Sequence, residues 1–202
     1  MADAVPDTPP ATRPLVLASS SPRRQELLTR AGYRFVVRPA DIDESERAGE
    51  AAIDYVLRLA REKADAVAHL SMEIDVVLAA DTTVDVDGQV LAKPLDADDA
   101  RRMLALLSGR PHRVHTGVAV AAAGTVDVHV VTTVISFRAL TRSEIDAYVA
   151  TGEPLDKAGA YGIQGGAMGF VSAVNGSLTN VIGLPLETVI PLLGAAGCRP
   201  HQ

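Results

Sequence analysis

The sequence predicts an α/β fold in which helices flank a mixed central sheet. Candidate strands and helices are mixed along the chain without strict alternation. A continuous apolar run, Val76–Ala80, is typical of a strand that is covered on both faces. Two long β-rich runs, Val114–Ala122 and Val126–Phe137, meet at Gly124 and predict a hairpin.

The remaining elements follow from apolar spacing and from residues that start or stop helices. In the first half we expect a strand at Leu15–Ala18, a helix from Pro22 to about Ala31, a strand at Arg34–Arg38, a long helix at about Ala48–His69 and a hairpin arm at Val84–Leu91. In the second half we expect helices from the cap Asp96 to about Leu107, over Thr141–Ala150 with a capping box, and over Pro185–Ala196, with a strand at Phe170–Val174.

The bulk composition is that of a globular protein. The chain has 202 residues, of which 48% are hydrophobic and 22% charged, enough for one domain or two closely packed lobes. Residues 1–13 are rich in proline, and we expect them to form a flexible tail ahead of a domain at 14–196.

Charge and cysteine content exclude several classes of protein. The net charge of −6 argues against a general nucleic-acid binder, which needs a basic face. No apolar run approaches the roughly 20 residues of a membrane helix. A single cysteine, Cys198, cannot form an internal disulfide, so we expect a cytoplasmic protein that does not contact a membrane.

The segment Ser19–Leu28 carries the sharpest chemical signal. Ser21 is a natural N-cap and Pro22 a natural first helical residue, so free backbone N–H groups there favour an anion. Arg23 and Arg24 occupy the first turn, where the helix dipole disfavours cations unless a phosphate binds. The alternative is an ordinary capped helix in which Arg23 pairs with Glu26.

A carboxylate, Asp81, ends the apolar run Val76–Ala80. Ligands of open α/β sheets bind outside the carboxyl ends of strands, and a carboxylate there can hold a divalent metal or accept a proton from water. The alternative is that Asp81 merely starts a turn, with Thr82 and Thr83 continuing the strand.

Two lysines are candidate phosphate ligands. Lys63 lies almost on the apolar stripe of its helix, where a charge must be paired, must reach a cleft or must extend past Ala60 to solvent. Lys93 follows a hairpin and could bind phosphate as a point charge, or could be an ordinary surface lysine.

Two loops complete the candidate site. The acidic loop Asp41-Ile42-Asp43-Glu44 could contribute to a Mg²⁺ site or could simply be solvated. In the glycine-rich stretch 156–166, Gln164 offers a donor and an acceptor that suit the edge of a base, although a mobile loop without a ligand has the same composition. The P-loop, G-x-S-x-G and H-E-x-x-H patterns are absent from the sequence.

Seven collinear stretches resemble the motifs of the Maf family of nucleoside triphosphate pyrophosphatases. They are Leu17–Leu28, Arg61–Ala64, Ala80–Thr82, Lys93-Pro94, Leu107–Arg110, Asp156–Gly165 and Gly183–Leu186. The resemblance implies a two-lobed fold with a mixed central sheet, related to inosine triphosphatases, and an active cleft between the lobes. It also implies a homodimer.

The same resemblance implies roles for individual residues. Asp81 would accept a proton from the attacking water with help from Mg²⁺ or Mn²⁺, and Glu44 would lie near the metal. The phosphate-binding set would be Ser19, Arg23, Arg24, Lys63 and Lys93.

Three positions of the family follow substrate choice. Here they are Arg23, Thr82 and Gln164, which match the branch that hydrolyses dTTP and UTP. We keep two alternatives: a pyrophosphatase for modified nucleotides such as 7-methyl-GTP, and a non-catalytic nucleotide-sensing regulator of cell division.

Overall fold

The computed structural model describes residues 12–72 and 75–201 and confirms the mixed α/β fold. One seven-stranded sheet has the order β2-β1-β3-β5-β6-β7, and β4 pairs with β3 beside this path. The strands are β1 (Leu15–Leu17), β2 (Val36–Val37), β3 (Val76–Val86), β4 (Gln89–Leu91), β5 (Pro111–Ala122), β6 (Thr125–Phe137) and β7 (Val171–Asn175). Most of the tail expected at 1–13 lies outside the described residues.

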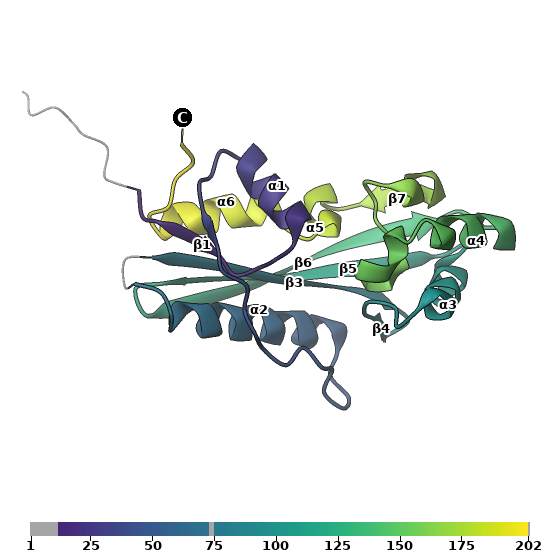
Figure 1. The fold of residues 1–202 in the computed structure, drawn as a ribbon, viewed down its shortest axis with the longest axis horizontal. Coiled ribbons are helices and arrows are strands. Elements are labelled where there is room, and N and C mark those ends of the chain that lie inside the picture. Colours follow the sequence, from purple (N-terminus) through teal and green to yellow (C-terminus); the bar gives the residue numbers. More distant parts are fainter. Residues whose placement is uncertain (1–11, 73–74, 202) are drawn as a thin grey trace, which may run out of the picture.

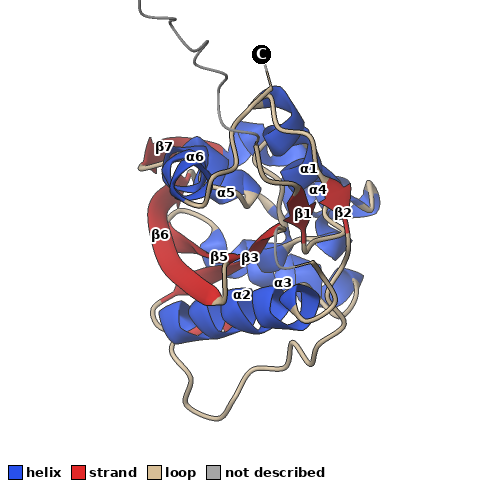
Figure 2. Cartoon of the chain, turned by 90° about the vertical axis from the view of Figure 1, so that its left-hand side faces the viewer, coloured by secondary structure: helices blue, strands red, loops and turns tan. Residues whose placement is uncertain are grey.

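Helices cover both faces of the sheet (Figure 1). Helix α2 (Ala52–Ala68) packs along one face across β3, β5 and β6, and the view in Figure 2 shows the same arrangement from the end. Helices α1 (Pro22–Arg30), α5 (Leu178–Ile182) and α6 (Leu186–Ala195) lie on the opposite face, whereas α3 (Ala97–Leu107) and α4 (Arg142–Ala150) gather at one end of the molecule.

The close fit of α2 against the sheet depends on one glycine. A Cβ atom on Gly117 of β5 would collide with the carbonyl group of Val56 in α2. Glycine has no Cβ, so the helix backbone approaches the strand directly. This approach brings the inward face of α2 close to β3, which lies next to β5 in the sheet.

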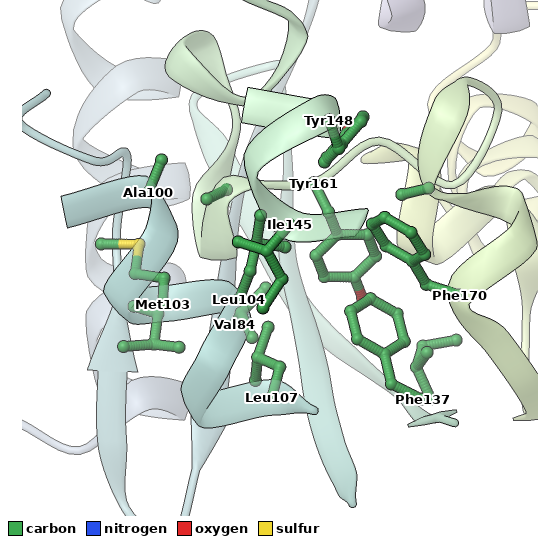
Figure 3. Packing of buried hydrophobic residues seen from close by; sticks show 14 of the residues in the cluster. Val84, Ala100, Met103, Leu104, Leu107, Phe137, Ile145, Tyr148, Tyr161 and Phe170 are labelled. Carbon is green, nitrogen blue, oxygen red and sulfur yellow. The ribbon is translucent and has the colours of Figure 1, made fainter. Parts of the chain in front are cut away.

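The apolar core is divided into clusters on either side of a polar zone. At one end, Val84 of β3 belongs to a cluster built from α3, α4 and β5–β7, in which Phe137, Tyr161 and Phe170 meet edge to face (Figure 3). At the other end, Ala79 and Ala80 belong to two clusters that cover opposite faces of the sheet. The residues of β3 between these clusters are Asp81, Thr82 and Thr83. The two-lobed arrangement is therefore visible in the packing.

Several element boundaries differ from the sequence-based expectation. Strand β3 continues through Asp81 to Val86, so the expected strand at Val76–Ala80 and the first half of the expected hairpin arm are one element. Helix α2 begins at Ala52, four residues later than expected, because residues 48–49 form a turn and Ala51 is extended. The short helix α5 was not predicted. The capping box at Thr141 and the N-cap at Asp96 are confirmed.

Candidate active site

A cleft of about 520 Å³ opens on the edge of β3 that faces β1. Strand β1 pairs with β3 only as far as Leu78, and β4 pairs with the same strand from Val84 onward. Residues 79–83 of β3 therefore have β5 on one side and no strand on the other within the described part of the chain. This gap lies between the two lobes, and it holds Asp81.

The cleft collects the residues to which the sequence assigned a role in catalysis, phosphate binding or specificity; Asp41 and Asp43 of the acidic loop are not among its lining residues. Its lining includes Ser19, Arg23, Arg24, Glu44, Lys63, Asp81, Thr82, Lys93 and Gln164. These residues come from the segment after β1, the acidic loop, α2, β3, the segment after β4 and the glycine-rich stretch.

Asp81 lies in the middle of β3, paired with Gly117 of β5, and not at a strand end. The expectation that it marks the carboxyl end of a strand is wrong. In the alternative, the continuation of the strand through Thr82 and Thr83 is correct, but Asp81 does not start a turn. The rule for carboxyl ends of strands does hold for β1, which leads directly into Ser19. Asp81 reaches the same cleft because its own strand is uncovered there.

Lys63 bridges two carboxylates at the base of the cleft. Its Nζ lies 2.6 Å from Asp81 Oδ1 and 2.8 Å from Glu44 Oε1. Lys63 is only 7% exposed and Asp81 8% exposed, so the ammonium does not extend past Ala60 to bulk solvent. A charge pair this deeply buried interacts strongly because little water screens it.

Tyr55 of α2 holds the acidic loop over this pair. Its hydroxyl donates a 2.9 Å hydrogen bond to the backbone carbonyl of Glu44. Burial, together with the charges of Asp81 and Glu44, raises the pKa of Tyr55 to about 12. The hydroxyl therefore keeps its proton and remains a donor at neutral pH.

Arg24 is fixed by three acceptors from different parts of the chain. Its Nε donates to Gly183 O (2.8 Å), one terminal nitrogen to Ser19 Oγ (3.0 Å) and the other to Thr82 Oγ1 (3.1 Å). Burial lowers the pKa of Arg24, and the nearby charge of Asp81 opposes that shift. Within the described chain, these bonds engage three of the five N–H groups of the guanidinium, which leaves two for an anion in the cleft.

A chain of buried hydroxyls supports Arg24 from below. Thr82 Oγ1 lies 3.0 Å from Thr116 Oγ1, and Thr116 donates to the backbone carbonyl of Asn180 in α5 at 3.0 Å. The Asn180 side chain in turn donates to Val114 O on β5. Neither Thr116 nor Asn180 could be predicted from the sequence, since single polar residues at buried positions carry no spacing pattern.

Arg23 lies at the mouth of the cleft with a third of its side chain exposed. One terminal nitrogen of Arg23 lies 3.6 Å from Asp156 Oδ2, whereas Glu26 forms an ion pair with Arg30. The alternative pairing of Arg23 with Glu26 is therefore wrong. The predicted N-cap is confirmed, because Ser21 Oγ accepts from the backbone N–H of Arg24.

Lys93 and Gln164 are exposed residues on the rim. The glycine-rich stretch that carries Gln164 forms short 3₁₀ turns rather than a long loop. Of the acidic loop, Glu44 lines the cleft, while Asp43 accepts a hydrogen bond from the backbone N–H of Ser45. The rim thus offers an amide, a cation and a carboxylate to a ligand.

The donors at the base fit a hard divalent cation. The carboxylates of Asp81 and Glu44 both lie within 2.8 Å of one Lys63 nitrogen, so their oxygens converge on a small volume. The described residues contain no group of three His, Cys, Asp or Glu side chains placed to hold a metal. Mg²⁺ commonly takes one or two protein carboxylates and completes its coordination with substrate phosphates and water.

Comparison with known proteins places this arrangement in a family. The family model described as Maf-like protein matches residues 14–196. The chain belongs to the Maf family. The expected resemblance is thereby confirmed.

Several curated Maf relatives share one printed name. A dTTP/UTP pyrophosphatase of Anaeromyxobacter dehalogenans is 56% identical over 91% of this chain and 94% of the relative. The protein of that name from Myxococcus xanthus is 54% identical over 91% of this chain and 92% of the relative. The protein of that name from Colwellia psychrerythraea is 45% identical over 98% of this chain and 95% of the relative. In this Maf protein, none of the helices within the described ranges is long and apolar enough to cross a membrane.

Proposed function

We propose that this protein hydrolyses dTTP and UTP to the nucleoside monophosphate and pyrophosphate, and so removes these nucleotides from the cellular pool. The observation that carries the proposal is the convergence of Asp81 with cationic side chains in one cleft. The relatives named dTTP/UTP pyrophosphatase support the choice of substrate.

The triphosphate binds along the cationic wall of the cleft. Ser19, Arg23 and Arg24 surround the start of α1, where backbone N–H groups and the helix dipole favour an anion. Lys93 adds positive charge after β4, and Lys63 offsets part of the negative charge of Asp81 and Glu44. Transfer to a phosphorus centre depends mainly on position and charge stabilisation, so a site rich in cations and poor in nucleophiles suits it.

Asp81 acts as the proton acceptor. A water held by its carboxylate attacks the α-phosphorus and gives up a proton to Asp81, and the new O–P bond replaces the bond from the α-phosphorus to the bridging oxygen. That oxygen leaves with pyrophosphate. The Lys63 ammonium at 2.6 Å fixes the direction of the Asp81 side chain, and Tyr55 fixes the loop that brings Glu44 to the same place.

Mg²⁺ or Mn²⁺ would be held by Asp81 and Glu44 together with phosphate oxygens. When bound, such an ion supplies positive charge beside the phosphate and favours deprotonation of water. The role of the protein side chains is to hold the ion beside the reacting group and to orient the nucleotide.

Three residues set the choice of base. Arg23, Thr82 and Gln164 line one cleft. Gln164 can donate to the O4 carbonyl of uracil or thymine and accept from N3–H, whereas cytosine presents the reverse pattern and is matched only when the amide is turned over. We also propose that the protein works as a homodimer, as the family resemblance implies, and in the cytoplasm, which suits a chain with one cysteine.

A nucleotide panel tests the proposal. The purified protein is incubated with dTTP, UTP, CTP, ATP, GTP and 7-methyl-GTP in Mg²⁺ or Mn²⁺, and pyrophosphate is distinguished from phosphate by adding inorganic pyrophosphatase. We expect pyrophosphate from dTTP and UTP first, and ¹⁸O from labelled water in the monophosphate. Release of phosphate, no turnover, or a clear preference for 7-methyl-GTP would refute the proposal.

A further inference from the structure

The segment that carries Gln164 is held by two side chains outside the predicted site. The backbone N–H of Gly162, two residues before Gln164, donates to the Tyr148 hydroxyl at 3.0 Å. The backbone N–H of Gly166, two residues after Gln164, donates to Glu153 Oε2 at 3.0 Å. Gln164 thus sits at the centre of a five-residue arch fixed at both ends.

The two anchors are joined to each other. Tyr148 donates a 3.0 Å hydrogen bond to Glu153 Oε1, so one hydroxyl and one carboxylate connect both ends of the arch. Tyr148 is 5% exposed and packs edge to face against Phe170 in the apolar cluster of Figure 3. The arch is therefore attached to the rigid core of its lobe.

The glycines of the arch are explained by the same carboxylate. A Cβ atom on Gly165 would overlap the Glu153 carboxylate, and a Cβ on Gly162 would come within 2.7 Å of Lys157 Cε and 2.9 Å of Glu153 Oε1. The backbone is thus wrapped closely around the Glu153 side chain, which also lines the cleft. Neither glycine has a backbone φ in the left-handed region, so close approach is the physical reason for glycine here.

We propose that Glu153 is a positioning residue for Gln164, and that with Tyr148 it sets the preference of the cleft for uracil and thymine over cytosine. The inference rests on the proposed function, because it assumes that Gln164 reads the base. A bidentate contact with a base edge is weaker when the amide is mobile. An arch without its anchors should therefore bind uracil less tightly, while binding of the phosphates is unchanged.

The experiment compares UTP with CTP in wild type, Glu153→Ala, Glu153→Gln and Tyr148→Phe. We expect Glu153→Ala to lower kcat/KM for UTP by about tenfold, mainly through KM, and to change the value for CTP by less than about twofold. Tyr148→Phe should shift the UTP-to-CTP ratio in the same direction by about threefold, since one hydrogen-bond link of the arch remains. Glu153→Gln should fall between wild type and Glu153→Ala, because its amide oxygen can still accept from Gly166.

A matched control and a second readout separate positioning from folding. Glu26→Ala removes a half-exposed surface carboxylate from α1 and should leave the ratio unchanged. Amide hydrogen exchange, followed by NMR without nucleotide, should speed up at Gly166 in Glu153→Ala and at Gly162 in Tyr148→Phe.

Three outcomes would overturn the inference. Equal losses for UTP and CTP would mean that Glu153 only stabilises the lobe. A ratio altered by Glu153→Ala but not by Tyr148→Phe would mean that the carboxylate touches the base itself. Unchanged exchange at both glycines would mean that the arch is held by other contacts. A wild-type protein that releases no pyrophosphate from any nucleotide would instead refute the proposed function.

Discussion

The Lys63 ammonium and the Asp81 carboxylate form a buried pair across the space between α2 and β3, with 2.6 Å between Nζ and Oδ1. Glu44 contacts the same ammonium at 2.8 Å. Lys63 therefore offsets part of the charge of two carboxylates that would otherwise repel each other.

Lys63→Met should destabilise the fold and increase its response to metal. Removing one partner of a buried pair leaves an uncompensated charge, so we expect a loss of about 3 kcal/mol in the free energy of unfolding. Mg²⁺ or Mn²⁺ should then raise Tm more in the variant than in wild type, because the ion no longer competes with an ammonium. Thermal unfolding with and without metal measures both effects. The exposed Lys93→Met is the control, and equal metal shifts in Lys63→Met and wild type would contradict the expectation.

Asp81→Asn should abolish most turnover while preserving the fold. The amide keeps the shape of the side chain but loses the base and much of the attraction for a cation, so kcat should fall at least about a hundredfold. Steady-state release of pyrophosphate measures the loss. Asp43→Asn alters an exposed carboxylate of the acidic loop and should retain activity within about twofold. Near-normal turnover by Asp81→Asn would reject Asp81 as the proton acceptor.

Gly117→Ala should weaken both stability and catalysis. The added methyl group collides with the Val56 carbonyl, so α2 must move away from β5 and carry Lys63 with it. Overpacking of this kind lowers the free energy of unfolding by about 1–3 kcal/mol. Urea unfolding measures the loss of stability, and kcat/KM measures the loss of catalysis. Gly194→Ala, where a Cβ meets open space in α6, is the matched control and should be neutral or slightly stabilising. Equal behaviour of the two variants would show that the close approach is unimportant.

Stability should fall in mild acid partly because of His112. This residue is 3% exposed, and burial lowers the pKa of its imidazole from 6.5 to about 4. Between those two pH values the unfolded chain takes up a proton that the folded chain does not. The free energy of unfolding therefore decreases as pH falls, by about 3 kcal/mol near pH 4.

The variant His112→Gln isolates this contribution. Glutamine can still hydrogen-bond to the Tyr161 hydroxyl, which lies 2.8 Å from His112 Nε2, but it does not titrate in this range. The difference in unfolding free energy between wild type and variant should therefore shrink as pH falls from 6.5 to 4. Urea titrations across that range test the expectation, and parallel pH profiles would argue against it.

Local signals predicted the parts of the fold that depend on neighbouring residues. The N-caps Ser21 and Asp96 and the hairpin at Gly124 follow from short-range rules, and the structure has them. The length of β3 could not be read in this way, because polar Asp81 and Thr82 interrupt the apolar run. They remain in the strand because pairing with β5 holds them there.

The lining of the cleft could be predicted where residue type alone indicates the chemistry. Clustered arginines, an inward lysine and an isolated carboxylate indicated a phosphate cleft, and the structure brings these residues together. The supporting residues could not be predicted, because each contacts a backbone group in another segment of the chain. These residues are Tyr55, Asn180 and Glu153. Their roles become apparent only when the backbone groups that they hold are known.

The unbroken course of β3 through both lobes limits how the protein can move. Its ladder with β5 runs from Val77 to Asp85 and crosses the cleft floor without a break. A hinge at that point would have to break several ladder hydrogen bonds, so we expect little hinge motion between the lobes at this strand. We therefore expect admission of the nucleotide and departure of pyrophosphate to depend on the rim segments, while Asp81 keeps its place in the ladder between β3 and β5.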